Sequence, residues 1–111
     1  MTDKELLELA AKAADEKIDW DNIRDYGSFT AYRLRFENEF WNPLHDDGDA
    51  LRLAVKLRIA ITFPVGENVV RVWASGQGTD PIYVPLDNDS DAAVRLAVVL
   101  AAAELGKLIV S

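Results

Sequence analysis

Three segments with β-strand character follow one another in the second half of the chain without a helix between them. Residues 59–63 and 68–74 are rich in β-branched and aromatic side chains, and residues 82–85 form a third, shorter segment. The intervening run Pro64-Val65-Gly66-Glu67 can close an antiparallel hairpin. Because helices do not separate the strands regularly, the sequence excludes a doubly wound parallel sheet and favours an antiparallel one.

Helices are predicted where apolar side chains recur at helical spacing behind an N-terminal capping signal. Thr2 and Glu5 have the form of a capping box, and Asp46, Asp47 and Asp49 place carboxylates at the start of a second helix. A third helix begins at Asp89 or Ser90, with Gly106 as its C-cap. The predicted helices cover residues 3–17, about 48–58, and 90–106.

A half-buried strand is predicted over residues 29–40, where Tyr32, Leu34 and Phe36 alternate with polar side chains. Residues 19–28 have loop composition, residues 75–80 suggest a flexible turn, and residues 107–111 are apolar enough to form a small strand or to pack on a helix. We therefore expect residues 1–111 to form one α+β domain. Its antiparallel sheet of about four strands is sandwiched by three helices, in the order α-β-α-β-β-β-α.

Two of the predicted helices resemble each other in sequence. Residues 47–57 read DGDALRLAVKL and residues 89–100 read DSDAAVRLAVVL, with a spacing that differs by one residue. Good caps and strong helix formers can converge on such a pattern. An internal duplication is the alternative.

The net charge of −7 makes direct binding of nucleic acid unfavourable and would favour a basic partner. The absence of cysteine excludes disulfides and thiolate chemistry and fits a reducing cytoplasm. The polar N-terminus and the interrupted apolar stretch at residues 94–105 predict neither a signal peptide nor a membrane span. We expect a cytoplasmic protein that is a monomer or a homodimer and has no cofactor.

The run WNPLHDDGDALRLAVKL at residues 41–57, the opening DKELLELA at residues 3–10 and the end of the last helix, AELGK at residues 103–107, resemble a family of small phage and prophage proteins. These are grouped as phage ABA-sandwich-domain proteins. The resemblance implies a sheet sandwiched between helices and a phage or prophage origin, and it carries no activity. Residues 15–39 match this family least well.

His45, Asp46, Asp47 and Asp49 form the one cluster with the appearance of a chemical site. An imidazole beside three carboxylates could hold a divalent metal or another small ligand, although the spacing does not fit an EF-hand loop. Carboxylates are also the preferred caps of a helix N-terminus. His45 is the only candidate for a general base, and no nucleophile for it is apparent. We therefore predict no enzymatic activity.

A partner-binding surface is predicted from Arg33, Arg35 and Trp41 together with His45, Asp46 and Asp47. The two arginines share the polar face of one strand, which suits a phosphate or an acidic peptide but is also ordinary for a solvated face. Trp41 either packs at the edge of the sheet, which we favour, or forms an exposed platform. The expected function is binding of a host or phage protein, with inhibition of a host or defence factor as one use.

Overall fold

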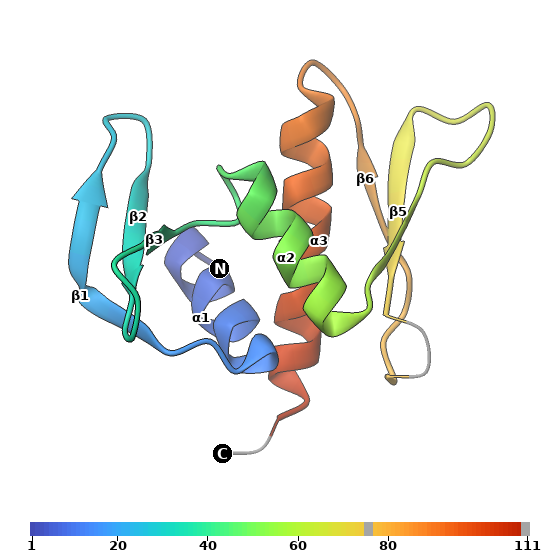
Figure 1. Ribbon diagram of the computed structural model, residues 1–111. Helices are drawn as coiled ribbons and strands as arrows, with labels where there is room; N and C mark the ends of the chain where they lie inside the picture. Colours follow the sequence, from blue (N-terminus) through green and yellow to red (C-terminus); the bar gives the residue numbers. More distant parts are fainter. Residues whose placement is uncertain (75–76, 110–111) are drawn as a thin grey trace.

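Three helices lie between two small antiparallel sheets in the computed structural model, which describes residues 1–74 and 77–109 (Figure 1). The helices are α1 (Asp3–Ala14), α2 (Asp47–Leu57) and α3 (Ser90–Lys107). The strands are β1 (Ile18–Asp25), β2 (Thr30–Leu34), β3 (Phe40–Trp41), β4 (Ala60–Thr62), β5 (Val69–Trp73) and β6 (Ile82–Pro85). No helix in these two described stretches is long and apolar enough to cross a membrane.

Each sheet is an antiparallel meander of three consecutive strands. The first sheet has the order β1-β2-β3 and the second has the order β4-β5-β6. Ile61 pairs with Val72 in the second sheet, and Tyr32 pairs with Trp41 in the first. The α+β class, the antiparallel pairing and the order of helices and strand groups are therefore confirmed. The strands divide between two sheets with the helices in the middle, instead of forming one sheet between helices.

The first sheet contains the main departures from the sequence-based expectation. Residues 18–25 form β1 where a loop was predicted, because an edge strand can keep its polar side chains in solvent, and its pairing with β2 is irregular between Asp19 and Ile23. The expected strand over residues 29–40 reverses instead, and Leu34 donates its N–H to the carbonyl of Glu39 across a tight turn. The reversal returns Trp41 to the core beside Tyr32 and leaves Phe36 81% exposed.

The helix ends follow the capping signals at the N-termini and differ at the C-termini. Thr2 and Glu5 form the predicted capping box, and Asp46 and Asp89 are the N-caps of α2 and α3. Helix α1 ends earlier than expected, because Asp15 adopts a left-handed conformation at its C-cap. Helix α3 ends at Lys107 with Leu108 exposed, so the prediction of Gly106 as a C-cap is wrong. Residues 75–76 and 110–111 of the predicted turn and tail lie outside the described residues.

Gly106 instead lies where α1 and α3 pack most closely. These two helices are the most extensively packed pair of elements, and their contact is rich in alanine. A methyl group at Gly106 would overlap the carbonyl oxygen of Leu9 and lie 2.8 Å from the carbonyl carbon. Small side chains let two helix backbones approach each other, and the glycine marks the closest point of approach.

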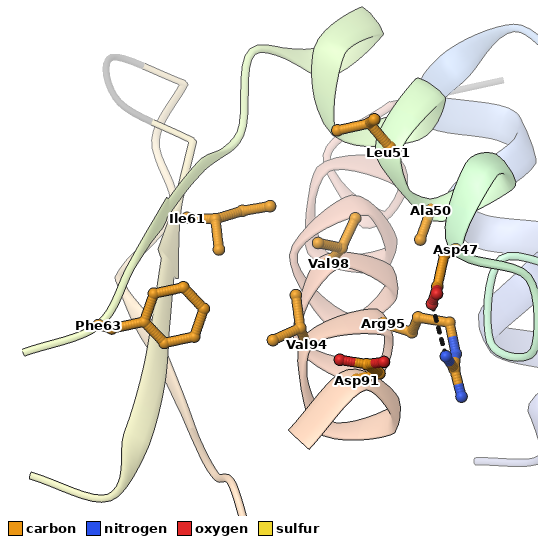
Figure 2. Close-up of a pocket in the computed structure, with 9 residues that line it drawn as sticks. All are labelled: Asp47, Ala50, Leu51, Ile61, Phe63, Asp91, Val94, Arg95 and Val98. Atoms are coloured by element: carbon orange, nitrogen blue, oxygen red, sulfur yellow. Dashed lines mark hydrogen bonds and ion pairs between the residues drawn. The ribbon is translucent and has the colours of Figure 1, made fainter. Parts of the chain in front are cut away.

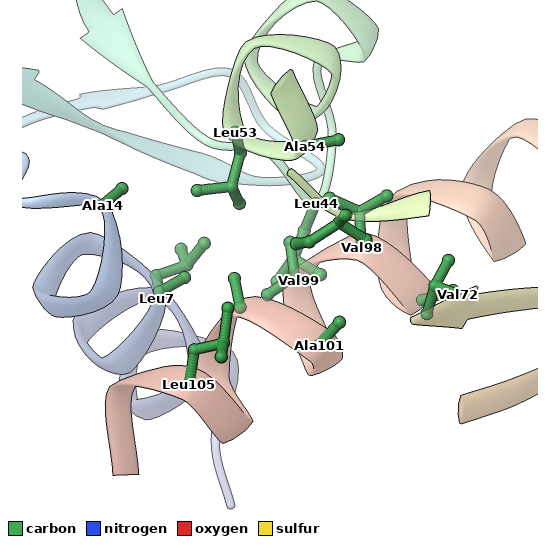
Figure 3. Close-up of a cluster of buried hydrophobic side chains, with 14 of the residues drawn as sticks. Leu7, Ala14, Leu44, Leu53, Ala54, Val72, Val98, Val99, Ala101 and Leu105 are labelled. Atoms are coloured by element: carbon green, nitrogen blue, oxygen red, sulfur yellow. The ribbon is translucent and has the colours of Figure 1, made fainter. Parts of the chain in front are cut away.

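The hydrophobic core surrounds this helix pair. Leu7, Val98 and Val99 are almost completely buried, with Leu53 and Leu105 close to them (Figure 3). Strands β5 and β6 pack on α3, and the first sheet adds Ile18 and Trp41 to the same core. One contiguous core therefore joins both sheets through the helices.

A helix followed by a three-stranded meander occurs twice along the chain. The N-caps of the three helices are Thr2, Asp46 and Asp89, at nearly equal intervals. Helices α1 and α2 both end at a left-handed residue, Asp15 and Arg58, before the next strand begins. Helix α3 follows the second meander as a third helix, and the sequence similarity between residues 47–57 and 89–100 lies in α2 and α3.

Replacing Gly106 with alanine tests the close approach. Alanine normally stabilises a helix interior by about 1 kcal/mol relative to glycine. Here we expect a loss of about 1–3 kcal/mol, because the helices must separate to admit the methyl group. Urea denaturation of Gly106→Ala measures the change, with the exposed Glu104→Ala as a control that should stay within about 0.5 kcal/mol of the parent. A stabilised Gly106→Ala variant would contradict this account of the packing.

Candidate functional site

The acidic cluster at the start of α2 has structural partners. Asp46 accepts a hydrogen bond from the N–H of Asp49 at 2.9 Å and so caps the helix. Asp47 accepts one from Arg95 at 2.6 Å. His45 is exposed and stacks on Phe29, with ring centroids 4.5 Å apart and planes nearly parallel. Each side chain is thus engaged by a different part of the fold.

Asp49 is the buried member of the cluster and connects α2 to the first sheet. It is 8% exposed and accepts hydrogen bonds from the N–H of Asn42 at 3.0 Å and from the Arg52 guanidinium at 2.7 Å. Asn42, which is also buried, donates to the carbonyl of Thr30 in β2. The hydrogen bond that Arg52 donates to Asp49 raises the pKa of the Arg52 guanidinium above its already high value. Both carboxylate oxygens of Asp49 therefore have a hydrogen-bond donor, as a buried carboxylate requires.

The structure does not gather this cluster around one point. Within residues 1–74 and 77–109, no group of three or more histidine, aspartate or glutamate side chains is placed to hold a metal ion. Asp46 and Asp49 bind backbone groups near the helix start, whereas Asp47 binds Arg95 of α3. Helix capping and packing are thus the observed roles of these carboxylates.

The remaining residues of the predicted partner surface lie on or beside the first sheet. Trp41 is 5% exposed and belongs to the core, so the packing alternative is confirmed. Arg33 is half-buried, and its Nε atom is buried without a hydrogen-bond partner. Arg35 is exposed at the turn that follows β2. The structure therefore leaves Arg35, and part of Arg33, available on this sheet.

A mainly polar depression of about 580 Å³ adjoins the first sheet. Its cations are engaged already, because Arg24 lies over the ring of Phe40 at 4.5 Å and Arg52 binds Asp49. Arg33 and Arg35 are not among the residues that line it. This depression offers little unsatisfied charge to a ligand.

An apolar groove of about 330 Å³ lies between α2, α3 and β4, and we call it the α2–β4 groove (Figure 2). Val94 and Val98 of α3 face Ile61 and Phe63 of the β4 segment across it, and α2 provides the third side. Asp47, Asp91 and Arg95 form its polar end. Its apolar lining residues are Ala50, Leu51, Ile61, Phe63, Val94 and Val98.

Large apolar side chains border the groove and remain in solvent. Leu51 is 61% exposed and Phe63 is 57% exposed, and Val55, one helical turn beyond Leu51, is 59% exposed. Strand β4 is an edge of the second sheet and pairs only with β5. An apolar surface with a concave centre, rimmed by charge, is typical of a protein-binding site.

Sequence reasoning included Leu51 in a helix and residues 59–63 in a strand but did not connect them into a site. A signal was present in α2, where Leu51 and Val55 widen the apolar stripe formed by Ala50, Leu53 and Ala54. An apolar stripe wider than the part of the helix that the core covers indicates that the helix also contacts something other than the core.

No protein-family model, curated protein or solved structure gives a significant match to this chain.

Removing the Asp49 carboxylate tests its bridging role. In Asp49→Ala, the buried N–H of Asn42 loses its acceptor, and we expect a loss of about 2–4 kcal/mol in the free energy of unfolding. Asp49→Asn retains an acceptor and should lose less. Chemical denaturation provides the measurement. Asp47→Ala, which removes a largely exposed carboxylate from the same helical turn, is the matched control and should cost about 1 kcal/mol or less. Equal effects of Asp47→Ala and Asp49→Ala would refute the bridging role.

Proposed function

We propose that the chain is a small non-enzymatic protein of a phage or prophage that acts in the bacterial cytoplasm by binding another protein. The α2–β4 groove is its binding site in this proposal. The observation that carries it is the exposure of Leu51 and Phe63, which line an apolar groove, and of Val55, one helical turn from Leu51. Each of these side chains is more than half exposed to solvent, unlike a side chain in the core.

Burial of this surface would contribute directly to association. A large apolar side chain gains about 1.5–3 kcal/mol on full burial, and part of that remains available at each of these positions. Binding energy usually concentrates in a few apolar or aromatic anchors within a polar rim. Phe63 and Leu51 supply the anchors, and Asp47 and Asp91 supply the rim.

The non-enzymatic part of the proposal rests on the state of the candidate base. His45 is stacked on Phe29, and the sequence contains no cysteine that it could activate. The phage or prophage origin rests on the resemblance of residues 41–57 and of both end helices to phage proteins. A protein that covers a functional surface of a host or defence factor would inhibit that factor.

Crosslinking inside cells tests the proposed binding site. A photoreactive phenylalanine analogue at Val55 is expected to crosslink a bacterial or phage protein, because Val55 lies one helical turn from Leu51, which lines the groove, and its exposure lets the analogue fit without disturbing the core. Phe63→Ser should abolish that crosslink. Val65→Ser should not, because Val65 is fully exposed in the turn after β4.

Both serine variants replace exposed side chains and should unfold close to the parent temperature. The proposal is wrong if the crosslinked protein is retained at full yield in Phe63→Ser. It is equally wrong if the analogue at Val65 captures the same protein as efficiently as the analogue at Val55.

A further inference from the structure

We infer that the α2–β4 groove receives a basic amphipathic helix of the partner protein. This inference rests on the proposed function and specifies the chemistry of what is bound. Its support comes from a comparison of the three helices and from the charge around the groove.

The three helices place apolar side chains at equivalent positions after their N-caps. In α1 and α3 these side chains are buried or half-buried, whereas in α2 they are more than half exposed. The equivalent residues are Leu7, Leu51 and Val94, and one turn further on Ala11, Val55 and Val98. Helix α2 therefore exposes an apolar stripe whose equivalents in α1 and α3 are buried or half-buried.

A helix is the occupant that matches this stripe. Leu51 and Val55 are one helical turn apart, so their side chains form a ridge along α2. In α1 the equivalent pair lies in the core, where α3 is the main neighbour. A helix laid beside α2 would cover the ridge and direct its own apolar side chains toward Phe63 and Val94.

Pairing of an extended strand with β4 is the weaker alternative. Strand β4 comprises only Ala60–Thr62, so an added strand would gain few main-chain hydrogen bonds. It would also leave the Leu51 and Val55 ridge uncovered, because that ridge belongs to α2.

The charge around the groove selects a basic helix. At its polar end Arg95 pairs with Asp47 and donates, at 2.9 Å, to the carbonyl of Leu44, so the exposed Asp91 is the carboxylate there that an incoming cation would meet. The whole chain carries a net charge of −7. Lysine or arginine on the incoming helix would meet complementary charge, whereas a second copy of this chain would meet repulsion.

Model peptides test the inference. The probe is a fluorescein-labelled peptide of leucine and lysine, about 18 residues long, with leucines at helical intervals. The comparison peptides are an alternating leucine-lysine sequence, which favours a strand, and a helical leucine-glutamate sequence. Fluorescence anisotropy against the full chain measures binding. We expect the helical lysine peptide to bind at least about tenfold more tightly than either comparison peptide.

Variants locate the binding. Leu51→Asp and Phe63→Ser should each weaken binding of the helical lysine peptide by about tenfold or more, whereas Val65→Ser should leave it unchanged. Because the attraction is partly electrostatic, affinity should also fall as salt concentration rises. Binding that is insensitive to both groove variants would overturn the inference.

The other outcomes separate this inference from the proposed function. Groove-dependent binding of the alternating or acidic peptide would overturn the basic-helix occupant and leave protein binding by the groove intact. A dimer detected by sedimentation that dissociates in Leu51→Asp would identify a second copy as the occupant and overturn the inference. Failure of all three peptides, together with loss of the Val55 crosslink, would overturn both proposals.

Discussion

The contact between α1 and α3 is the constraint on which the remaining structure depends. Gly106 permits the two backbones to meet at Leu9, and the alanine-rich surfaces on either side maintain that short separation. Helix α3 also supports β5 and β6, and the same core receives Ile18 and Trp41 from the first sheet. The apolar area buried along this contact provides much of the driving force for a chain of this size.

Local chemistry explains why the helices were predicted well. The N-caps Thr2, Asp46 and Asp89 use short-range hydrogen bonds that can be recognised from sequence, and the strand at residues 82–85 is bounded by prolines. Strand β1 was missed because its composition is that of a loop, and it becomes a strand by pairing with β2 at the solvent-exposed edge of the first sheet. The strand pairings within each meander are local, but the placement of the two sheets on either side of the helices depends on contacts between distant segments. Gly106 was misassigned for a similar reason, since its neighbour Leu9 is remote in sequence.

The candidate site shows the same separation between local and tertiary information. The aspartates before α2 were correctly seen as potential caps, and Asp46 performs that role. The burial of Asp49 depends on Asn42 and so on the position of the first sheet. The exposure of Leu51 and Val55 depends on which surfaces of α2 the rest of the chain leaves uncovered. Sequence alone therefore predicts the helices and the strand that border the groove, but neither their approach to one another nor the accessibility of their side chains.

The packing of α1 against α3 also has a consequence for the order of folding. Helix α1 leaves the ribosome before α2 and both meanders, yet its main neighbour is α3, which is synthesised after all of them. Local meanders such as β1-β2-β3 can form during translation, because their pairings span few residues. The central core must wait for Gly106 to emerge, and until then the apolar side of α1 has no permanent cover. Synthesis through the end of α3 thus sets the moment at which the nascent chain can acquire its native core.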